Sequence, residues 1–233
     1  MYKRVLLKIS GEALSSAEQT LCGETIDRTA SVIRDIRARG VELGIVVGGG
    51  NIMRGRSAGN MERNRADHMG MLATAINALA LQDALERIGV PCTVLSAVAM
   101  NRFCDEFTAR GAQKLLSEGT VVIFACGTGS PFFSTDTGAA LRAAEIHADA
   151  LLLAKNVDAV YSADPNTDPN AKRYAHLSYD KVIADDLKAT DITAITMCRD
   201  NKLAIHVFAM PKILDVFNGA VTGTVIDEDP DIY

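Results

Sequence analysis

The chain has 233 residues, of which 48% are hydrophobic and 23% charged, and its formal net charge is -5 at pH 7. This length and apolar content are enough for a large α/β core, and we expect a single domain over residues 1–233. The negative charge argues against a general nucleic-acid-binding or anionic-membrane surface, although it permits a local basic cleft.

Short apolar runs are predicted as strands, and segments with apolar residues at helical spacing are predicted as helices. In chain order the strands are 5–9, 43–47, 92–95, 121–125, 150–154, 205–208 and a short last one at 223–226. The helices are 26–39, 68–88, 109–117, 138–146 and 191–201. Apolar strands that alternate with helices predict an α/β three-layer sandwich, with a largely parallel sheet and helices on both faces. Ligands of such sheets bind at the carboxyl ends of the strands.

The first predicted strand carries a lysine, Lys8, one residue before its end at Ile9, and the small residues Ser10 and Gly11 follow. Buried lysines are rare unless they are paired, and an ammonium group at a strand end suits contact with phosphate oxygens. The alternative is an edge strand in which Lys3 and Lys8 both face water.

The second strand ends in three glycines, Gly48, Gly49 and Gly50. Glycine costs about 0.5 to 1 kcal/mol relative to alanine in regular structure, so the run indicates positive φ values or close approaches that a Cβ would forbid. The turn is either an anion-binding nest of backbone amides or a tight connection between strand and helix. The sequence fits neither GxxxxGK[ST] nor GxGxxG, which disfavours Walker-type NTPases and standard dinucleotide folds.

Arginines follow the glycine run at positions 54, 56, 63 and 65. Most such clusters are solvated loops, but Arg54 lies close enough in sequence to the turn for bidentate contact with phosphate. Further along, Asp67 opens the predicted helix and is either a cap or a ligand contact, while Met69 and Met71 suit core packing.

The segment 126–138 after the fourth strand is rich in glycine and hydroxyl side chains and contains Asp136. Thr135 or Asp136 could be the N-cap of the next helix. A helix N-terminus preceded by small residues also favours anions, and Phe132 and Phe133 offer apolar walls for a planar ligand. Beyond it, the Asp-Pro steps within 158–169 are sound turn chemistry without any ligand.

The cysteines and histidines give no metal-binding pattern. The five cysteines form no CxxC pair, which suits reduced core thiols in a cytoplasmic protein. The four histidines, at 68, 147, 176 and 206, also lack metal-like spacing, so we predict structural roles and no protein metal site. Lys8 and Glu12 interrupt the apolar start that faintly imitates a signal peptide, and no run is long enough to span a membrane.

Taken together, these residues resemble the bacterial-type uridylate (UMP) kinases of the amino acid kinase family. Five motifs follow in the family's order, and the likeness covers almost the full chain. They are Lys8 to Glu12; Gly48 to Asn51 with Arg54 and Gly55; Asp67 to Thr74; Gly127 to Gly129 with Pro131 to Phe133, Thr135 and Asp136; and Val157 and Asp158 through Tyr161 to Ala163, Asp164 and Pro165.

The resemblance implies a fold, a reaction and an assembly. The reaction is ATP + UMP giving ADP + UDP in pyrimidine nucleotide biosynthesis, with Mg²⁺ accompanying ATP. The assembly is a cytoplasmic homohexamer that GTP and UTP commonly regulate. Here the loop 15–23 lacks the glycine-rich form of some members, and Gln82 and Glu86 replace basic residues that resemble an effector contact in others.

The resemblance also implies roles for individual residues. The ATP phosphates would meet Lys8, Ile9, Ser10, Gly11, Gly50 and Arg54, and the adenine side would be lined by Lys155, Asn156, Tyr161 and Asp164. UMP would be held by Gly49, Asp67, Thr128, Gly129, Ser130, Pro131, Phe132, Phe133, Ser134 and Thr135. The catalytic set would be Lys8, Arg54, Asp136 and Asp191, the two carboxylates orienting cationic side chains or magnesium.

Three alternatives stay open from the sequence. Sister enzymes on this fold phosphorylate carboxylates or carbamate, and the loop from Pro131 to Asp136 is the feature that discriminates against them. A relative stores oxoanions without catalysis, whereas Lys8 and Arg54 together argue for an enzyme. Nucleic-acid binding through the arginine-rich loop is the third alternative.

Overall fold

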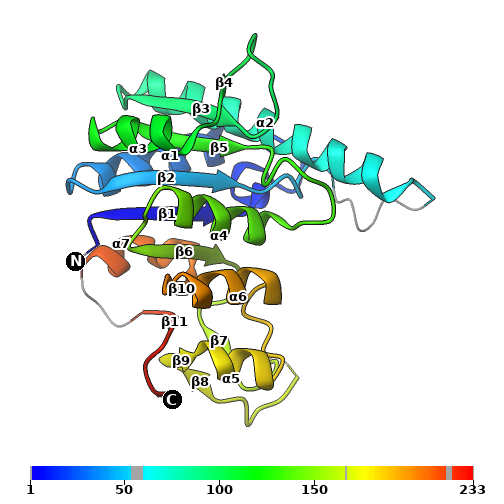
Figure 1. The fold of residues 1–233 in the computed structure, drawn as a ribbon, viewed down its shortest axis with the longest axis vertical. Coiled ribbons are helices and arrows are strands. Elements are labelled where there is room, and N and C mark those ends of the chain that lie inside the picture. The colour runs from blue at the N-terminus through cyan, green and yellow to red at the C-terminus, as the bar shows by residue number, and fades with distance from the viewer. Residues whose placement is uncertain (1, 54–59, 166, 219–221, 233) are drawn as a thin grey trace.

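The computed structural model describes residues 2–53, 60–165, 167–218 and 222–232. A nine-stranded sheet crosses the molecule, with the strands in the order β4-β3-β5-β2-β1-β6-β10-β11-β9 (Figure 1). Among the described strands of this sheet, only the pair β10 and β11 is antiparallel. The predicted largely parallel sheet is therefore confirmed.

The strands of the large sheet are β1 (Arg4–Ile9), β2 (Glu42–Val47), β3 (Cys92–Ser96), β4 (Asp105–Glu106), β5 (Val121–Ala125), β6 (Ala150–Lys155), β9 (His176–Ser178), β10 (Ala204–Ala209) and β11 (Thr224–Asp227). A separate antiparallel pair consists of β7 (Val160–Tyr161) and β8 (Arg173–Tyr174). The helices are α1 (Gly23–Arg37), α2 (Arg63–Arg87), α3 (Ala109–Ser117), α4 (Thr135–Glu145), α5 (Tyr179–Ala184), α6 (Ile192–Asp200) and α7 (Ile213–Phe217), with 3-10 turns η1 (Gly11–Leu14) and η3 (Met210–Lys212).

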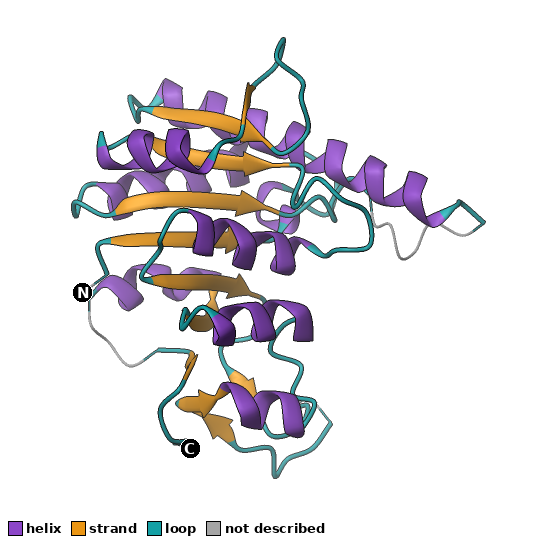
Figure 2. Ribbon diagram, in the orientation of Figure 1, coloured by secondary structure: helices purple, strands orange, loops and turns teal. Residues whose placement is uncertain are grey.

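Helices cover both faces of the sheet, as Figure 2 shows. One core joins the sheet to α1, α2 and α7, and includes Ile33, Leu81 and Phe217. The other joins it to α3, α4, α5 and α6, and includes Leu116 and the alanines of α4. Because successive strand residues face opposite sides, every central strand supplies apolar side chains to both cores. This explains why the predicted strands are apolar throughout.

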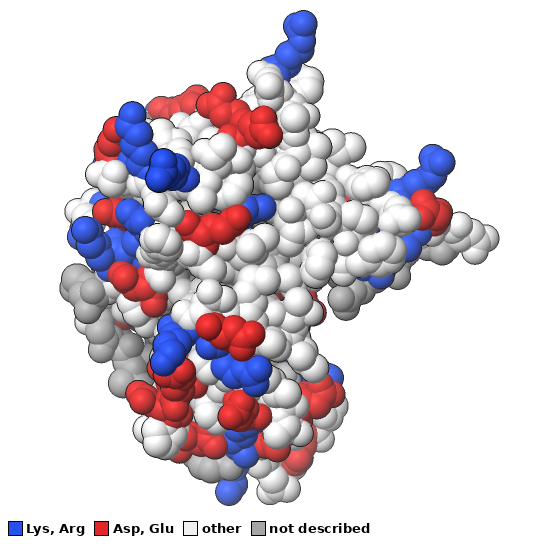
Figure 3. Space-filling view, in the orientation of Figure 1, with Lys and Arg blue, Asp and Glu red and all other residues white. Residues whose placement is uncertain are grey.

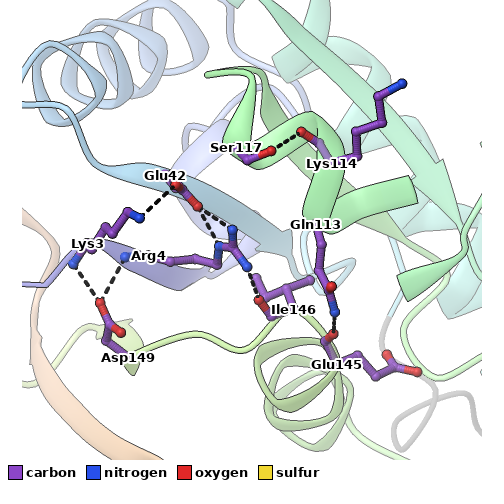
Figure 4. Close-up of polar contacts among 9 residues, drawn as sticks. All are labelled: Lys3, Arg4, Glu42, Gln113, Lys114, Ser117, Glu145, Ile146 and Asp149. Carbon is purple, nitrogen blue, oxygen red and sulfur yellow. Dashed lines mark hydrogen bonds and ion pairs between the residues drawn. The ribbon is translucent and has the colours of Figure 1, made fainter. Parts of the chain in front are cut away.

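Polar contacts tie the amino ends of the strands together, away from their carboxyl ends (Figure 4). The Arg4 guanidinium lies 2.5 Å from a carboxylate oxygen of Glu42 on the neighbouring strand and donates to the carbonyl of Ile146 at 2.7 Å. The Asp149 carboxylate accepts from the backbone amides of Lys3 and Arg4 at 2.6 and 2.9 Å. These contacts fix the register of β1 with β2 and with the connection into β6.

The structure also contains elements that the sequence reading did not predict. These are β4, the β7–β8 pair, β9, α5 and α7, all of which are short. In addition, α2 begins at Arg63, five residues before the predicted start at 68. Within the described residues no helix combines the length and apolar character needed to cross a bilayer.

The cysteines and histidines have largely structural surroundings. All five cysteines are free thiols, and burial raises the pKa of Cys198 to about 12. His176 lies 2.6 Å from the Asp227 carboxylate and 2.9 Å from the carbonyl of Pro230, so it connects β9 to the C-terminal segment.

Candidate active site

A cavity of about 510 Å³ opens at the carboxyl ends of β1, β2 and β5. Its walls come from the turn after β1, the glycine turn after β2, the first half of α2 and the loop between β5 and α4. Of the residues proposed from sequence, it is lined by Lys8, Ser10, Gly11, Gly49, Gly50, Asp67, Thr128, Ser130, Phe133, Ser134 and Thr135. The fold therefore brings half of the expected site residues to this cavity, including seven of the ten expected to hold UMP.

Glycine is required in the turn after β2 because the turn packs closely against other residues, and not because its backbone is left-handed. Gly48, Gly49 and Gly50 are absent from the residues with positive φ. At Gly49 a Cβ would lie 2.8 Å from the carbonyl oxygen of Gly70 and 2.9 Å from the Cβ of Ala73, both in α2. The turn thus lies directly against the helix, which leaves its backbone as the wall of the cavity.

A pair of asparagines holds this turn, and the sequence reading missed it. Asn77 of α2 is fully buried and donates to the carbonyl of Gly48 at 2.7 Å. Its amide also exchanges hydrogen bonds with Asn51 at 2.8 and 3.1 Å, and Asn51 donates to the carbonyl of Thr20 at 2.8 Å. A polar residue at an otherwise apolar helix position is the signal that could have identified Asn77, because buried amides need partners.

Two lysines reach the same face of the sheet because side chains alternate along a strand. Leu6 of β1 and Leu153 of β6 pack into the core under α4, so Lys8 and Lys155, each two residues further along, lie on that face as well. The strands are parallel neighbours, with Lys8 opposite Leu153. The side chain of Lys8 is only 14% exposed and β1 is central, so the edge-strand alternative is wrong.

Asp136, near the start of α4, lies between these two lysines. One carboxylate oxygen is 2.7 Å from the Lys8 ammonium, and the other is 3.0 Å from the Lys155 ammonium. Thr190 donates to that second oxygen at 2.7 Å. Burial alone would raise the pKa of Asp136, but the ammonium groups of Lys8 and then Lys155 outweigh it and hold the pKa well below its usual range. An ionised carboxylate therefore fixes two cations beside the cavity.

The opposite wall is formed by the loop from β5 to α4. Asp67 of α2 accepts from the backbone amide of Phe132 at 2.8 Å and from Arg63 at 2.7 Å. Phe132 itself has a positive φ of 72°. This backbone is uncommon for a bulky residue and persists where its surroundings fix it.

The capping alternatives for the carboxylates are wrong. Ser134 caps α4 and accepts from the amide of Thr137 at 3.1 Å, which leaves Asp136 free of that duty. Glu62 caps α2, so Asp67 lies inside the helix rather than at its start. Both aspartates instead hold together segments that are distant in sequence.

The profile of the amino acid kinase family matches residues 3–209. The chain belongs to this family. A uridylate kinase from Pseudomonas syringae pv. syringae (strain B728a) is 48% identical to it over 233 residues, covering 97% of this chain and 95% of the relative. The family resemblance drawn from the motifs is thereby confirmed.

Two solved structures of the same kind superimpose closely on this amino acid kinase. A UMP kinase from Bacillus anthracis has a TM-score of 0.95 at 35% identity, covering 99% of this chain and 98% of that chain. A UMP kinase from Ureaplasma parvum has a TM-score of 0.92 at 38% identity, covering 98% of this chain and all of that one. The expected fold is confirmed by both.

The remaining expected residues of this amino acid kinase lie around the cavity or further away. Ile9 is buried in β1, and Asn156 donates to Glu12 at 3.2 Å. Tyr161 donates to Asp158 at 3.0 Å in the β7–β8 region, and the carbonyl of Asp164 accepts in the turn that follows. Of the residues in these contacts, Glu12 lines the cavity, whereas Asn156, Tyr161 and Asp164 are not among the lining residues.

Three further expected residues have distinct surroundings. Asp191 precedes α6 and lines a second cavity of about 390 Å³ beside the first, while its neighbour Thr190 makes the contact to Asp136. Phe132 is largely exposed, with the Arg63 guanidinium 5.4 Å from its ring centroid. Arg54 lies outside the described residues.

Proposed function

We propose that this chain transfers the γ-phosphoryl group of MgATP to UMP, giving ADP and UDP. The observation that carries the proposal is the pair of ammonium groups, Lys8 and Lys155, held on one carboxylate beside a cavity with a glycine turn. The uridylate and UMP kinases that match over nearly the whole chain support the choice of acceptor.

The chemistry needs little from the protein beyond charge and alignment. The attacking group is a phosphate oxygen that is already anionic near neutral pH, so no general base is required. Two repelling anions must be brought end to end and their charge offset in the transition state. Lys8 and the backbone of Ser10, Gly11 and Gly50 would do this for the phosphates of ATP.

The position of Lys155 in the structure supports a second role for it, in addition to the one that the sequence implied. The resemblance puts this lysine on the adenine side, with Asn156, Tyr161 and Asp164. Its ammonium group lies 3.0 Å from Asp136, the same carboxylate that binds Lys8. We infer that Lys155 also serves the phosphate end of ATP, while the β7–β8 region and Asn156 serve the base.

The acceptor would lie along the wall built by Gly49, Asp67 and the loop 128–135. A carboxylate can accept two hydrogen bonds from a vicinal diol, which suits Asp67 for the ribose of UMP. Phe132 and Phe133 supply apolar surface for the base. Arg54, outside the described residues, is proposed to contact phosphate and to complete the catalytic set with Lys8, Asp136 and Asp191.

Mg²⁺ would enter with ATP, where it neutralises charge on the phosphates. Asp136 is the carboxylate that contacts both lysines. Both of its oxygens already meet ammonium groups, so it fits the orientation of lysines better than metal coordination. Mg²⁺ is commonly held by one or two carboxylates together with substrate phosphates and water, and Asp191 is the carboxylate we propose for it.

We further propose a single-domain, cytoplasmic enzyme of pyrimidine nucleotide biosynthesis that assembles as a homohexamer. Met69, Leu72 and Ile76 of α2 are exposed apolar side chains, which supports contact with another subunit. In the view of Figure 3, charged side chains are sparse over the part of the surface near this helix, except at its tip. Light-scattering mass measurement tests the assembly.

We propose that UTP regulates this chain and that GTP does not activate it. Regulation by UTP is what the family resemblance implies. On α2, Gln82 donates to Glu86 at 2.8 Å, and neither side chain offers a cation for a triphosphate. We expect a titration of GTP to leave the initial rate unchanged, and strong activation would contradict this.

A coupled assay tests the reaction itself. The purified chain is offered UMP, CMP, acetylglutamate and aspartate in turn with MgATP, and ADP formation is followed. UMP should be turned over at least about 100-fold faster than the carboxylate acceptors, because their smaller anions cannot span the cavity. Equal rates with a carboxylate acceptor would reject the proposed substrate.

A further inference from the structure

The loop that follows β5 has left-handed backbone at several residues, and contacts from neighbouring elements must stabilise this conformation. Cys126, Gly127 and Gly129 have positive φ values of 64°, 57° and 82°. For a residue with a side chain, such as Cys126, left-handed backbone costs roughly 1 to 2 kcal/mol. The loop contributes Thr128 and Ser130 to the cavity, so its shape decides where these hydroxyl groups lie.

Arg142 of α4 contacts this loop at Gly127 and is not among the residues that line the cavity. Its side chain is only 5% exposed, and one guanidinium nitrogen donates to the carbonyl of Gly127 at 3.2 Å. Another nitrogen is paired with Glu145, and the guanidinium carbon lies 4.0 Å from the ring centroid of Phe107. Burial lowers the pKa of Arg142, opposed by the charge of Glu145. A buried cation is tolerated when it is this fully partnered.

The partners of Arg142 are themselves fixed. Glu145 ends α4, and Gln113 of α3 donates to its carbonyl at 2.7 Å (Figure 4). The ring of Phe107 meets Phe124 of β5 edge-on, with centroids 5.6 Å apart. The guanidinium therefore has a single orientation, which directs a donor at Gly127.

The loop is packed closely from two other sides. A Cβ on Gly138 of α4 would lie 3.1 Å from the Cα of Gly127, and one on Gly129 would lie 3.1 Å from the carbonyl of Ala97. Neither contact includes a hydrogen bond. Two side chains accept from backbone amides of the loop: Thr74 from Cys126 and Asp67 from Phe132, each at 2.8 Å. Among the described residues, Arg142 is the side chain that donates a charge-assisted hydrogen bond to a carbonyl of this turn.

We propose that Arg142 is a positioning residue for the acceptor: through the carbonyl of Gly127 it holds the loop that presents Thr128 and Ser130 to UMP. This inference rests on the proposed function. Arg142 is not among the residues that line the cavity, and its polar contacts are to Glu145 and Gly127 rather than to Lys8, Asp136 or Lys155. Its loss should therefore weaken acceptor binding and leave ATP binding intact.

The test compares Arg142→Met, Arg142→Lys and Arg37→Met, with KM for UMP and for ATP measured well below each variant's Tm. Arg37 is the matched control, because it also donates from a helix to a backbone carbonyl, that of Gly119 at 2.8 Å, but away from the cavity. For Arg142→Met we expect KM for UMP to rise about tenfold, as for loss of a charged hydrogen bond, with KM for ATP within about twofold. Arg142→Lys, which keeps a cationic donor, should recover part of this loss.

A merely structural role would lower Tm in Arg142→Met and Arg37→Met alike and leave both KM values unchanged, and that result overturns the proposal. Equal increases in both KM values also overturn it. If Arg142→Met does not fold, Phe107→Leu and Arg142→Lys carry the test, each with a smaller rise confined to the acceptor. If the wild type prefers another acceptor, the proposed substrate fails, and the same comparison with that acceptor still decides the role of Arg142.

Discussion

The two walls of the cavity hold their functional groups by different means. On the side of β1, where Lys8 lines the cavity, the ionised carboxylate of Asp136 binds the ammonium groups of Lys8 and Lys155, so side chains from regular elements carry the charge. On the other wall, Asp67 is joined to a loop with left-handed residues by a hydrogen bond from the backbone amide of Phe132. The first arrangement suits stabilisation of a charged transition state, and the second suits recognition of a shape.

This contrast predicts which kinetic constant each wall controls. Groups that act mainly on charge developing in the transition state change kcat, whereas groups that bind substrate and transition state equally change KM. Loss of a charged group around Asp136 should therefore lower kcat, and loss of the Asp67 contact should raise KM for the acceptor.

Replacing Lys8 should have the largest effect. In Lys8→Ala we expect kcat to fall about 10³-fold, equivalent to about 4 kcal/mol, because the cation beside the transferring phosphate is lost. KM for UMP should change less than about threefold, since the acceptor wall is untouched. Lys3→Ala is the control, because Lys3 precedes the same strand with an 83% exposed side chain. Wild-type turnover in Lys8→Ala would refute the division.

Asp136→Asn should lower kcat about 100-fold through the two lysines, because the neutral amide no longer fixes either ammonium group. The variant keeps the shape of the side chain, so its fold is expected to survive. Asp180→Asn is the matched control, since Asp180 lies at the second position of α5, as Asp136 does in α4, and is exposed. Steady-state rates for both variants measure the difference. An effect limited to KM for UMP would show that Asp136 serves acceptor binding and not the transition state.

Asp67→Asn tests the acceptor wall. We expect KM for UMP to rise about tenfold with a smaller change in kcat, because an amide accepts through only one oxygen and loses the charge. Asp83→Asn, on the same helix but with a 71% exposed side chain, should leave both constants unchanged. A fall in kcat as large as that of Lys8→Ala would remove the distinction between the walls.

The smallest effect concerns stability against pH. The pKa of Asp136 is lower in the folded chain than the ordinary value near 4, so the folded chain gains stability from this group above that value. The gain shrinks as pH falls below the ordinary value, because the unfolded chain then binds a proton at this carboxyl while the folded chain keeps it ionised. The gain is gone only at a pH low enough to protonate Asp136 in the folded chain. Urea unfolding of the wild type should therefore lose more stability between pH 7 and pH 3.5 than unfolding of Asp136→Asn. Identical losses would show that the folded chain does not favour the ionised carboxylate.

Local patterns predicted the long elements well and the short ones poorly. β5 and α3 match their predicted bounds, since each is a continuous apolar or amphipathic segment with clear ends. The two-residue strands β4, β7 and β8 carry too few residues for any period to show. They form because neighbouring backbone is already in place to accept their hydrogen bonds.

Site residues likewise fall into those that the sequence predicted and those that it missed. Lys8 and the glycine turn were predicted because a charge in an apolar strand and three glycines in succession are unusual in sequence. Asn77, Thr190 and Arg142 were missed, since each looks ordinary on its helix or loop until its partner is known. Their importance comes from the carbonyl of Gly48, the carboxylate of Asp136 and the carbonyl of Gly127, all more than ten residues away.

The sequence by itself determined the α/β architecture, the family and the turns that line the cavity, because these follow from periodicity and residue type within short segments. Only the tertiary structure decided that Asp136 binds two lysines instead of capping its helix, and that the glycines serve packing instead of left-handed backbone. Both outcomes depend on groups from separate strands and helices meeting in space. No local pattern specifies such distances, which are fixed when the two cores pack against the sheet.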